Sequence, residues 1–423
     1  MNAPGCPTRQ RPSASSEHAA EFLSIAAALS LVFSASVGFG VVTPVLPAAL
    51  TQMRPGLSAE ELAWHTGLLT GVYTFMGFGL ARLWGQLSDR VGRKPVLLAA
   101  AAGHAIMLTL FPLVPGLLFA YLLRAGAGIF AAAIVPVGLA WLSDFSPQPL
   151  RARRFAALTI ASLLGFLVGP VIGAYFGGGP GSRWLQQTGF DLGAMTLPFL
   201  TAGAIGAVAW FICLLAPAWR APAAPGHEQA DAATAGPLPT LVALITMGGA
   251  VAFALGGFEV GLTLLSTQAL QLSQAKLAAM FVECSVVMIV AQGLISIGVF
   301  DRLRPRAVLA AGAVILALGF GLLPFTGAGV AMALSIAAVA ASGGILLPLL
   351  SYWASLQSAH ARGAALGTQS SFASLGQALG SSSAGGLFAL APGAPFWAAA
   401  LAVATSWLAV SALASPRSVQ HVE

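Results

Sequence analysis

Three charged side chains in this sequence stand well inside long apolar runs. Glu259 and Glu283 are acids, and Arg124 is a base. A charge at the middle of a bilayer costs about 2.5–3.5 kcal/mol even on mild scales, so its retention indicates a role. Because burial favours the protonated form of a carboxyl group, we expect the two glutamates to carry protons, to bind a cationic substrate, or to do one each. The alternative is that the acids are solvated in an outer cavity and that Arg124 is a structural partner to carbonyls or to an acid.

A second group of charges lies in a short turn punctuated by glycine, GQLSDRVGRKPVL, residues 85–97. Its charged residues are Asp89, Arg90, Arg93 and Lys94. Gly92 permits a positive φ, and Gly85 permits close helix approach. Asp89 is expected to meet a helix N-terminus or a base of a neighbouring span, since either favours an anion. We interpret the turn as a latch that closes one side of the molecule in one state. The alternative is that its bases only fix topology.

The composition requires a membrane environment for these groups. The chain has 423 residues, of which 57% are hydrophobic and 8% charged, against about 25% charged in soluble domains. Apolar runs of about 20 residues, enough to cross a bilayer, recur along the whole length. The net charge of +6 does not indicate nucleic-acid binding, because the bases stand in short turns between apolar runs.

The predicted fold class is all-α integral membrane, with twelve transmembrane helices in two pseudo-symmetric six-helix bundles. The expected spans are 22–50, 64–84, 95–115, 117–142, 155–178, 192–216, 240–268, 276–298, 306–325, 327–354, 364–390 and 394–414. The predicted division is a disordered cytoplasmic N-terminus (1–21), a first bundle (22–216), a cytoplasmic linker (217–239), a second bundle (240–414) and a cytoplasmic tail (415–423).

Bases are distributed unevenly between the expected turns. With both termini cytoplasmic, 15 of the 19 Lys and Arg residues fall in inside segments and 3 in outside turns, with Arg124 within a span. Cytoplasmic loops carry the excess of bases in membrane proteins. We therefore expect a multi-pass protein of the cell inner (plasma) membrane with both termini inside.

Features of the first half recur about 211 positions later. Asp89-Arg90 recurs as Asp301-Arg302, so the latch includes Asp301 and Arg302. The glycine pair of GFLVGPVIG, with Gly165, Gly169, Pro170 and Gly173, recurs as Gly376 and Gly380. Small residues allow close helix packing, and proline bends a helix. We place this stretch at the contact between the halves, where it seals or rocks; plain dense packing is the alternative. Parallel repeats place a substrate site between them.

These motifs resemble those of the major facilitator superfamily across essentially the whole chain. Residues 85–97 match the family's loop signature between spans 2 and 3. GFLVGPVIG is similar to the span 5 motif of the drug:proton antiporter branch, and RAGAG, with Arg124 and Gly128, to the buried-arginine motif. Span 1, GFGVVTPVLPAAL, resembles that of the tetracycline-exporter-like group, but lacks the central acid of many multidrug members.

The resemblance implies a proton-coupled exporter of a small amphipathic organic molecule that works by alternating access. Export of a self-made metabolite or metal-chelating compound is the alternative, and uptake by symport is less favoured. The expected partners are the substrate, protons and the lipid bilayer, with no nucleic acid, and the protein is expected to be a monomer. A receptor on the same scaffold would need an output domain, and an enzyme would need a convergent catalytic or metal cluster. No Walker or dinucleotide loop appears, so no cofactor is implied.

Overall fold

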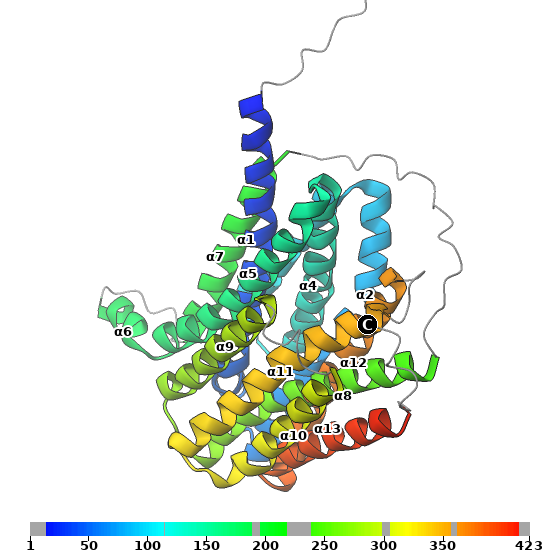
Figure 1. Cartoon of the computed structure of the whole chain (residues 1–423). Coiled ribbons are helices and arrows are strands. Elements are labelled where there is room, and N and C mark those ends of the chain that lie inside the picture. Colours follow the sequence, from blue (N-terminus) through cyan, green and yellow to red (C-terminus); the bar gives the residue numbers. More distant parts are fainter. Residues whose placement is uncertain are drawn as a thin grey trace, which may run out of the picture.

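The computed structural model describes residues 14–113, 115–187, 195–217, 238–297, 305–356 and 362–413 (Figure 1). Within these ranges the chain is helical and contains no strand, which confirms the all-α fold class. The helices before the predicted linker are α1 (Ala14–Met53), α2 (Ala59–Val91), α3 (Arg93–Leu110), α4 (Leu117–Phe145), α5 (Gln148–Phe176), α6 (Pro180–Gln187) and α7 (Thr196–Leu215). Those after it are α8 (Leu238–Leu264), α9 (Gln274–Ser296), α10 (Pro305–Leu322), α11 (Val330–Leu356), α12 (Arg362–Leu390) and α13 (Ala394–Leu413).

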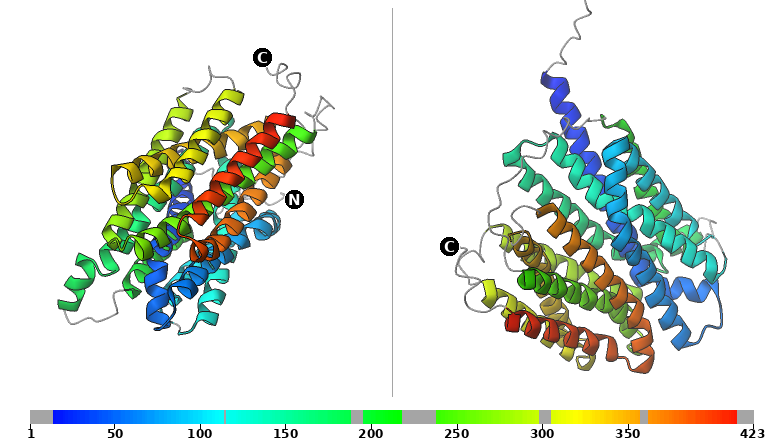
Figure 2. Two further views of the ribbon diagram at one scale, coloured as in Figure 1. Left: turned by 90° about the horizontal axis from the view of Figure 1, so that it is seen from below. Right: turned by 90° about the vertical axis from the view of Figure 1, so that its right-hand side faces the viewer.

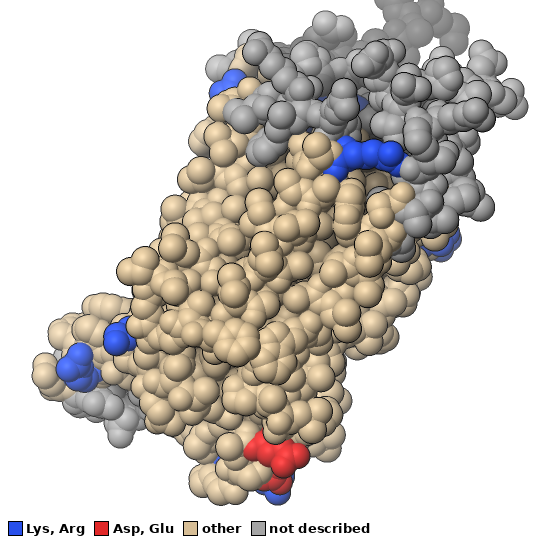
Figure 3. Space-filling model, turned by 60° about the horizontal axis from the view of Figure 1, so that its bottom comes forward, with Lys and Arg blue, Asp and Glu red and all other residues tan. Residues whose placement is uncertain are grey.

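The chain is a multi-pass membrane protein. Eight helices in the described ranges are long and apolar enough to cross a bilayer. The predicted spans in α2, α3, α12 and α13 are not among these eight. In α12 the reason is its many glycines and serines, which lower hydropathy and suit a helix packed between others. Figure 3 shows the charged side chains at the two ends of the visible face, with a wide uncharged belt between them.

The helices add detail to the sequence prediction and differ from it at two places, the start of α1 and the short helix α6. The first helix begins at Ala14 rather than at residue 22, and Glu21 on its early turns pairs with Arg154 of α5. The short helix α6 was not predicted, because its eight residues carry no long apolar run. The chain continues past α8 in a π-helical turn, Leu265–Ala269.

The buried apolar side chains form clusters that follow the two halves of the sequence. Two clusters contain residues between Ala27 and Ala216. The third contains residues between Ala243 and Val403, with Ala63 of α2 as its one member from the first half. Two groups of helices therefore have their own cores, and Ala63 of α2 joins the core of the second group.

The packing partners repeat between the groups. Helix α1 packs on α5 in the first group, and α8 packs on α12 in the second. The groups touch each other through α2 against α12 and through α5 against α9. Figure 2 shows α12 beside the helices of the first group, so it faces both groups.

Candidate functional site

Glu259 lies on α8, at the face that packs on α12. The side-chain amide of Gln377 on α12 lies within interaction distance of the Glu259 carboxyl group. The second carboxyl oxygen, Oε2, is buried and has no hydrogen-bond partner among the described residues. A buried polar atom without a partner is costly, so this oxygen is an open position for a proton or for a ligand donor.

Glu283 lies on α9 and is half-buried. The thiol of Cys284, next to Glu283 in the sequence, is within electrostatic reach of both Glu259 and Glu283. Glu283 also lines a cavity of about 250 Å³ between α9 and α11, together with Lys276 and Met332.

Arg124 stands apart from the acids. It is 1% exposed on α4, and its Nε donates a hydrogen bond to the Leu69 carbonyl oxygen of α2 at 3.2 Å. Its guanidinium carbon lies 4.4 Å from the centre of the Tyr73 ring, a cation–π distance. These contacts correspond to the structural alternative, in which Arg124 partners a carbonyl. The structure does not join it to Glu259 or Glu283 by a described ion pair.

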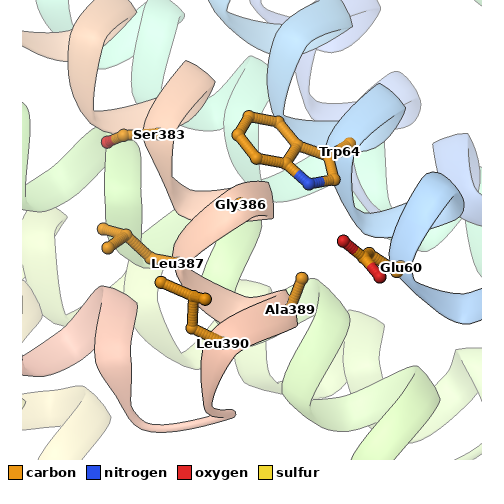
Figure 4. Close-up of a pocket in the computed structure, with 7 residues that line it drawn as sticks. All are labelled: Glu60, Trp64, Ser383, Gly386, Leu387, Ala389 and Leu390. Carbon is orange, nitrogen blue, oxygen red and sulfur yellow. The ribbon is translucent and has the colours of Figure 1, made fainter.

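The two groups of helices are in tight contact at one end of the α2–α12 pair. An ideal Cβ on Gly67 of α2 would lie 2.8 Å from the Ser381 carbonyl oxygen, and one on Gly71 would overlap the Ser382 hydroxyl. Beyond this contact lies a cavity of about 280 Å³, lined by Glu60, Trp64, Ser383, Gly386, Leu387, Ala389 and Leu390 (Figure 4). Larger side chains at Gly67 and Gly71 would hold the α2 and α12 backbones apart, so small residues are required at this end of the helix pair.

Towards the other end of α2, the close packing on α12 continues as far as Gly77, whose ideal Cβ would lie 3.3 Å from the Ser374 hydroxyl. A Cβ on Gly79 or Gly85 would meet nothing within 4 Å. The side chains of Leu83 and Leu87, which follow along the same helix, are exposed. The close helix approach predicted at Gly85 is therefore wrong for this structure, because α2 and α12 diverge before reaching it.

The turn at residues 85–97 forms as predicted at Gly92, which has φ +99°. Arg93 pairs with Asp89, and its Nε lies 3.0 Å from Asp144 Oδ2 at the end of α4. Burial alone would lower the pKa of the Arg93 guanidinium, but its bonds to Asp144 and Asp89 raise that pKa overall. The Lys94 ammonium donates to the Leu214 carbonyl oxygen at 2.9 Å, at the end of α7. The turn is thus tied to the first group of helices.

Among the described residues, the turn at residues 85–97 makes no ion pair with the second group. Asp89 meets Arg93 at the start of α3, and Arg90 is exposed. The described ion pairs and hydrogen bonds of the turn all lie in the first group. Asp301 and Arg302 lie outside the described residues.

The glycine motif of α5 packs on α1, within the first group. A Cβ on Gly165 would lie 2.5 Å from the Phe33 carbonyl oxygen, and one on Gly169 would lie 2.6 Å from the carbonyl carbon of Gly40. The predicted position of these glycines at the contact between halves is therefore wrong. Helix α5 does contact α9 of the second group, but Gly165, Gly169 and Gly173 face α1, and Pro170 lies against Gly40.

The repeat of this motif makes the equivalent contact in the second group. Gly376 faces Gly249, and Gly380 faces Phe253 and Gly257, all on α8. The Ser381 hydroxyl, at the position of Pro170, donates to the Gly256 carbonyl oxygen at 3.2 Å. We call this contact, Gly249–Glu259 of α8 against Gly376–Ser382 of α12, the α8–α12 seam.

Two members of the seam were not singled out as site residues from the sequence. Gln377 and Ser381 lie in a segment that reads as a run of small residues. The available signal was position: Gln377 follows the repeated Gly376, on a helix whose partner carries Glu259. In the described part of the chain, no group of three or more His, Cys, Asp or Glu side chains lies together as a metal site requires.

Comparison with known proteins identifies proteins of similar sequence and fold. The profile of the Major Facilitator Superfamily matches residues 28–303. The class G tetracycline resistance protein of Vibrio anguillarum is 36% identical over 151 residues, which is 36% of this chain and 37% of that protein. The class C protein of Escherichia coli is 37% identical over 142 residues, or 34% and 35% of the two chains.

The matched stretches thus span about a third of the length of these relatives. Among solved structures, the human organic anion transporter MFSD10 superposes with a TM-score of 0.66 at 19% identity, over 95% of this chain and 100% of that one. This likeness concerns the fold.

Proposed function

The chain belongs to the major facilitator superfamily, and from this premise we propose that it is a proton-coupled secondary transporter that exports a small amphipathic organic molecule by alternating access. The observation that carries the proposal is the Glu259 carboxyl, which has a buried, unpartnered oxygen at the seam of a helix that also contacts the other half. A buried acid in a transporter core suits a group that exchanges a proton with the two sides in turn.

The substrate class is proposed from the relatives. Their names concern tetracycline resistance, and the similarity covers about a third of the chain, so tetracycline is the first compound to test. Export of a self-made metabolite or of a metal-chelating compound is the alternative, and uptake is less favoured. We propose that Glu283, which like Glu259 is within electrostatic reach of Cys284, is the second coupling or substrate group.

The orientation and assembly are part of the proposal. The bias of bases supports an inner-membrane protein with both termini inside, and the turn at residues 85–97 then lies on the cytoplasmic side. In that orientation the tight α2–α12 contact at Gly67 and Gly71 is on the outer side, and the divergent end faces the cytoplasm. We propose two bundles, 22–216 and 240–414, joined by a cytoplasmic linker at 217–239, and a monomeric transporter.

Everted membrane vesicles that contain the protein test this function. The vesicles are energised so that their lumen is acid, tetracycline is added, and lumenal pH is followed with a dye. A proton antiporter is expected to dissipate the gradient when its substrate is added, because each transported molecule exchanges for protons. The control is the Glu259→Gln, Glu283→Gln double variant, matched for amount in the membrane.

The outcomes separate the alternatives. Loss of the gradient with the unmodified protein, and not with the double variant, supports proton-coupled tetracycline export. A response to a metal-chelating metabolite and not to tetracycline would move the substrate to the alternative class. No response to any of these compounds, with folded protein present, would contradict the export proposal.

A further inference from the structure

We propose that Gln377 is a positioning residue that transmits the protonation of Glu259 to the α2–α12 contact at Gly67 and Gly71, which we call the outer contact. The inference rests on the proposed function and deepens it, because it assigns the link between the proton and the opening of the molecule. It requires that one segment of α12 touch both the acid and the outer contact.

The first link is between Glu259 and Gln377. A helical side chain covers the turn that precedes its own Cα, so Glu259 covers the turn of Gly256. An ideal Cβ on Gly256 would lie 3.0 Å from Gln377 Cγ, so the glutamine occupies the space that this glycine leaves. The Gln377 amide lies within interaction distance of the Glu259 carboxyl. An amide has both donors and an acceptor, so it remains a partner for a carboxylate and for a carboxylic acid.

The second link is between Gln377 and the outer contact. One helical turn further along α12, Ser381 donates its hydroxyl hydrogen to Gly256 of α8, while its carbonyl oxygen faces Gly67 of α2. The carbonyl oxygen of Ala378 and the hydroxyl of Ser382 face Gly71. The segment Gln377–Ser382 therefore has α8 on one side and α2 on the other. Because these backbones are in contact, a shift of α12 along α8 must change its fit to α2.

The direction of the effect follows from the free Oε2 oxygen of Glu259. This oxygen is enclosed without a described partner while the outer contact is closed. A neutral carboxyl is enclosed at lower cost than a carboxylate. A proton on Glu259 therefore favours the closed outer contact, and loss of the proton favours its separation. Such a difference in cost between two states is what shifts a conformational equilibrium.

The other titratable groups on the neighbouring helices either have partners other than Glu259 or lie elsewhere along their helices. On α9, the Cys284 thiol is within electrostatic reach of Glu259 and of Glu283. On α2, His65 Nδ1 lies 2.9 Å from the Tyr121 hydroxyl, and Tyr73 faces Arg124. On α1, Glu21 pairs with Arg154. In sequence, α11 contains one titratable residue, Tyr352, and α12 contains one charged residue, Arg362, each near an end of its helix; α13 contains none. Glu60 lines the cavity beyond the outer contact.

The experiment measures the outer contact directly in the full-length protein in lipid nanodiscs. Cys6, Cys213 and Cys284 are replaced by Ala, and spin labels are attached to Glu60→Cys and Ala389→Cys, which lie on opposite walls of the cavity in Figure 4. Distance distributions are recorded at mildly acid and mildly alkaline pH. The ratio of separated to closed molecules is expected to rise about tenfold on the alkaline side. Glu259→Gln is expected to favour the closed contact and to show the same ratio of separated to closed molecules at both pH values.

The decisive variant is Gln377→Met, which keeps the size of the side chain and removes its hydrogen bonds. Its matched control is Gln369→Met, since Gln369 is also a buried amide of α12 that faces α8, at Gly248, but lies two turns from Gln377. Gln377→Met is expected to lose most of the response to pH, and Gln369→Met to keep it. If Gln377→Met does not fold, Gln377→Asn, which retains an amide on a shorter side chain, is expected to weaken the response.

Three results would overturn the inference, and they differ in what they leave standing. A full pH response in Gln377→Met and Gln377→Asn, together with its loss in Glu259→Gln, removes the role of Gln377 and leaves the proposed function intact. A full response in Glu259→Gln removes Glu259 as the proton site and the inference with it. If the distance between the two spin labels does not change with pH in the protein with native Glu259 and Gln377, the link between the proton and the outer contact is removed. The vesicle assay tests transport independently of this result.

Discussion

The two equivalent helix pairs of this protein, α1–α5 and α8–α12, share a backbone arrangement and differ in chemistry. In each, a pair of glycines four residues apart lets one helix rest on the backbone of the first helix of its group. In the first pair Pro170 lies against Gly40, and a hydrogen bond between the Ser36 and Ser162 hydroxyls, 2.8 Å long, crosses the pair. In the second, Ser381 replaces the proline, and Glu259 and Gln377 face each other.

This difference indicates how a duplicated scaffold acquires a proton-sensitive part. Close backbone packing supplies two rigid seams. Polar groups in one of them make its packing depend on charge, because a buried polar network is stable only when its members are satisfied. The first seam can then act as a fixed element, while the α8–α12 seam responds to Glu259.

The largest expected effect tests the shared backbone arrangement. Gly169→Leu in the first seam and Gly380→Leu in the second should each reduce transport by more than tenfold and destabilise the protein by about 3 kcal/mol or more, because the added side chain meets backbone. Transport in vesicles and thermal unfolding in detergent measure the two effects. Gly321→Leu on α10 is the matched control, since a Cβ there meets nothing within 4 Å. Normal transport by either seam variant would contradict the account of close packing.

An intermediate effect is expected at the turn of residues 85–97, which is tied to the first group. Arg93→Gln leaves Asp144 without its ion-pair partner, at a cost of about 1–3 kcal/mol. Amide hydrogen exchange in residues 85–97 should become faster, while the pH dependence of the outer contact should not change. Arg90→Gln, at an exposed position of the same turn, should alter exchange little. Slower or unchanged exchange in Arg93→Gln would show that these contacts do not hold the turn.

The smallest expected effect distinguishes the two seams from each other. Ser36→Ala and Ser381→Ala each remove one hydrogen bond, worth about 0.6 kcal/mol on average in membrane proteins. Both should lower thermal stability slightly, but only Ser381→Ala should shift the pH dependence of transport, because Ser381 lies between Gly256 and Gly67. An equal pH shift in both variants would remove the distinction between a fixed and a responsive seam.

The sequence predicts the helices well and their contacts less well. Apolar length located the spans, and the 211-residue repeat identified the glycines of both seams. The partner of those glycines was not predictable, because a small-residue face is compatible with any neighbouring helix. Arg124 and the glutamates look alike in sequence, as charges inside spans, but burial against Tyr73 gives Arg124 a separate environment. Gln377 could be identified only in the structure. A neutral amide costs less than a charge inside a span, so its presence there is a weaker sign of function.

The most direct test of the responsive seam compares two transport modes in Glu259→Gln proteoliposomes. Exchange of labelled for unlabelled tetracycline needs alternating access but no net proton movement, whereas uphill transport driven by a pH gradient needs both. The account predicts that Glu259→Gln retains exchange and loses gradient-driven accumulation, with Ser36→Ala normal in both. Accumulation by Glu259→Gln equal to that of the unmodified protein would contradict the assignment of proton coupling to the α8–α12 seam.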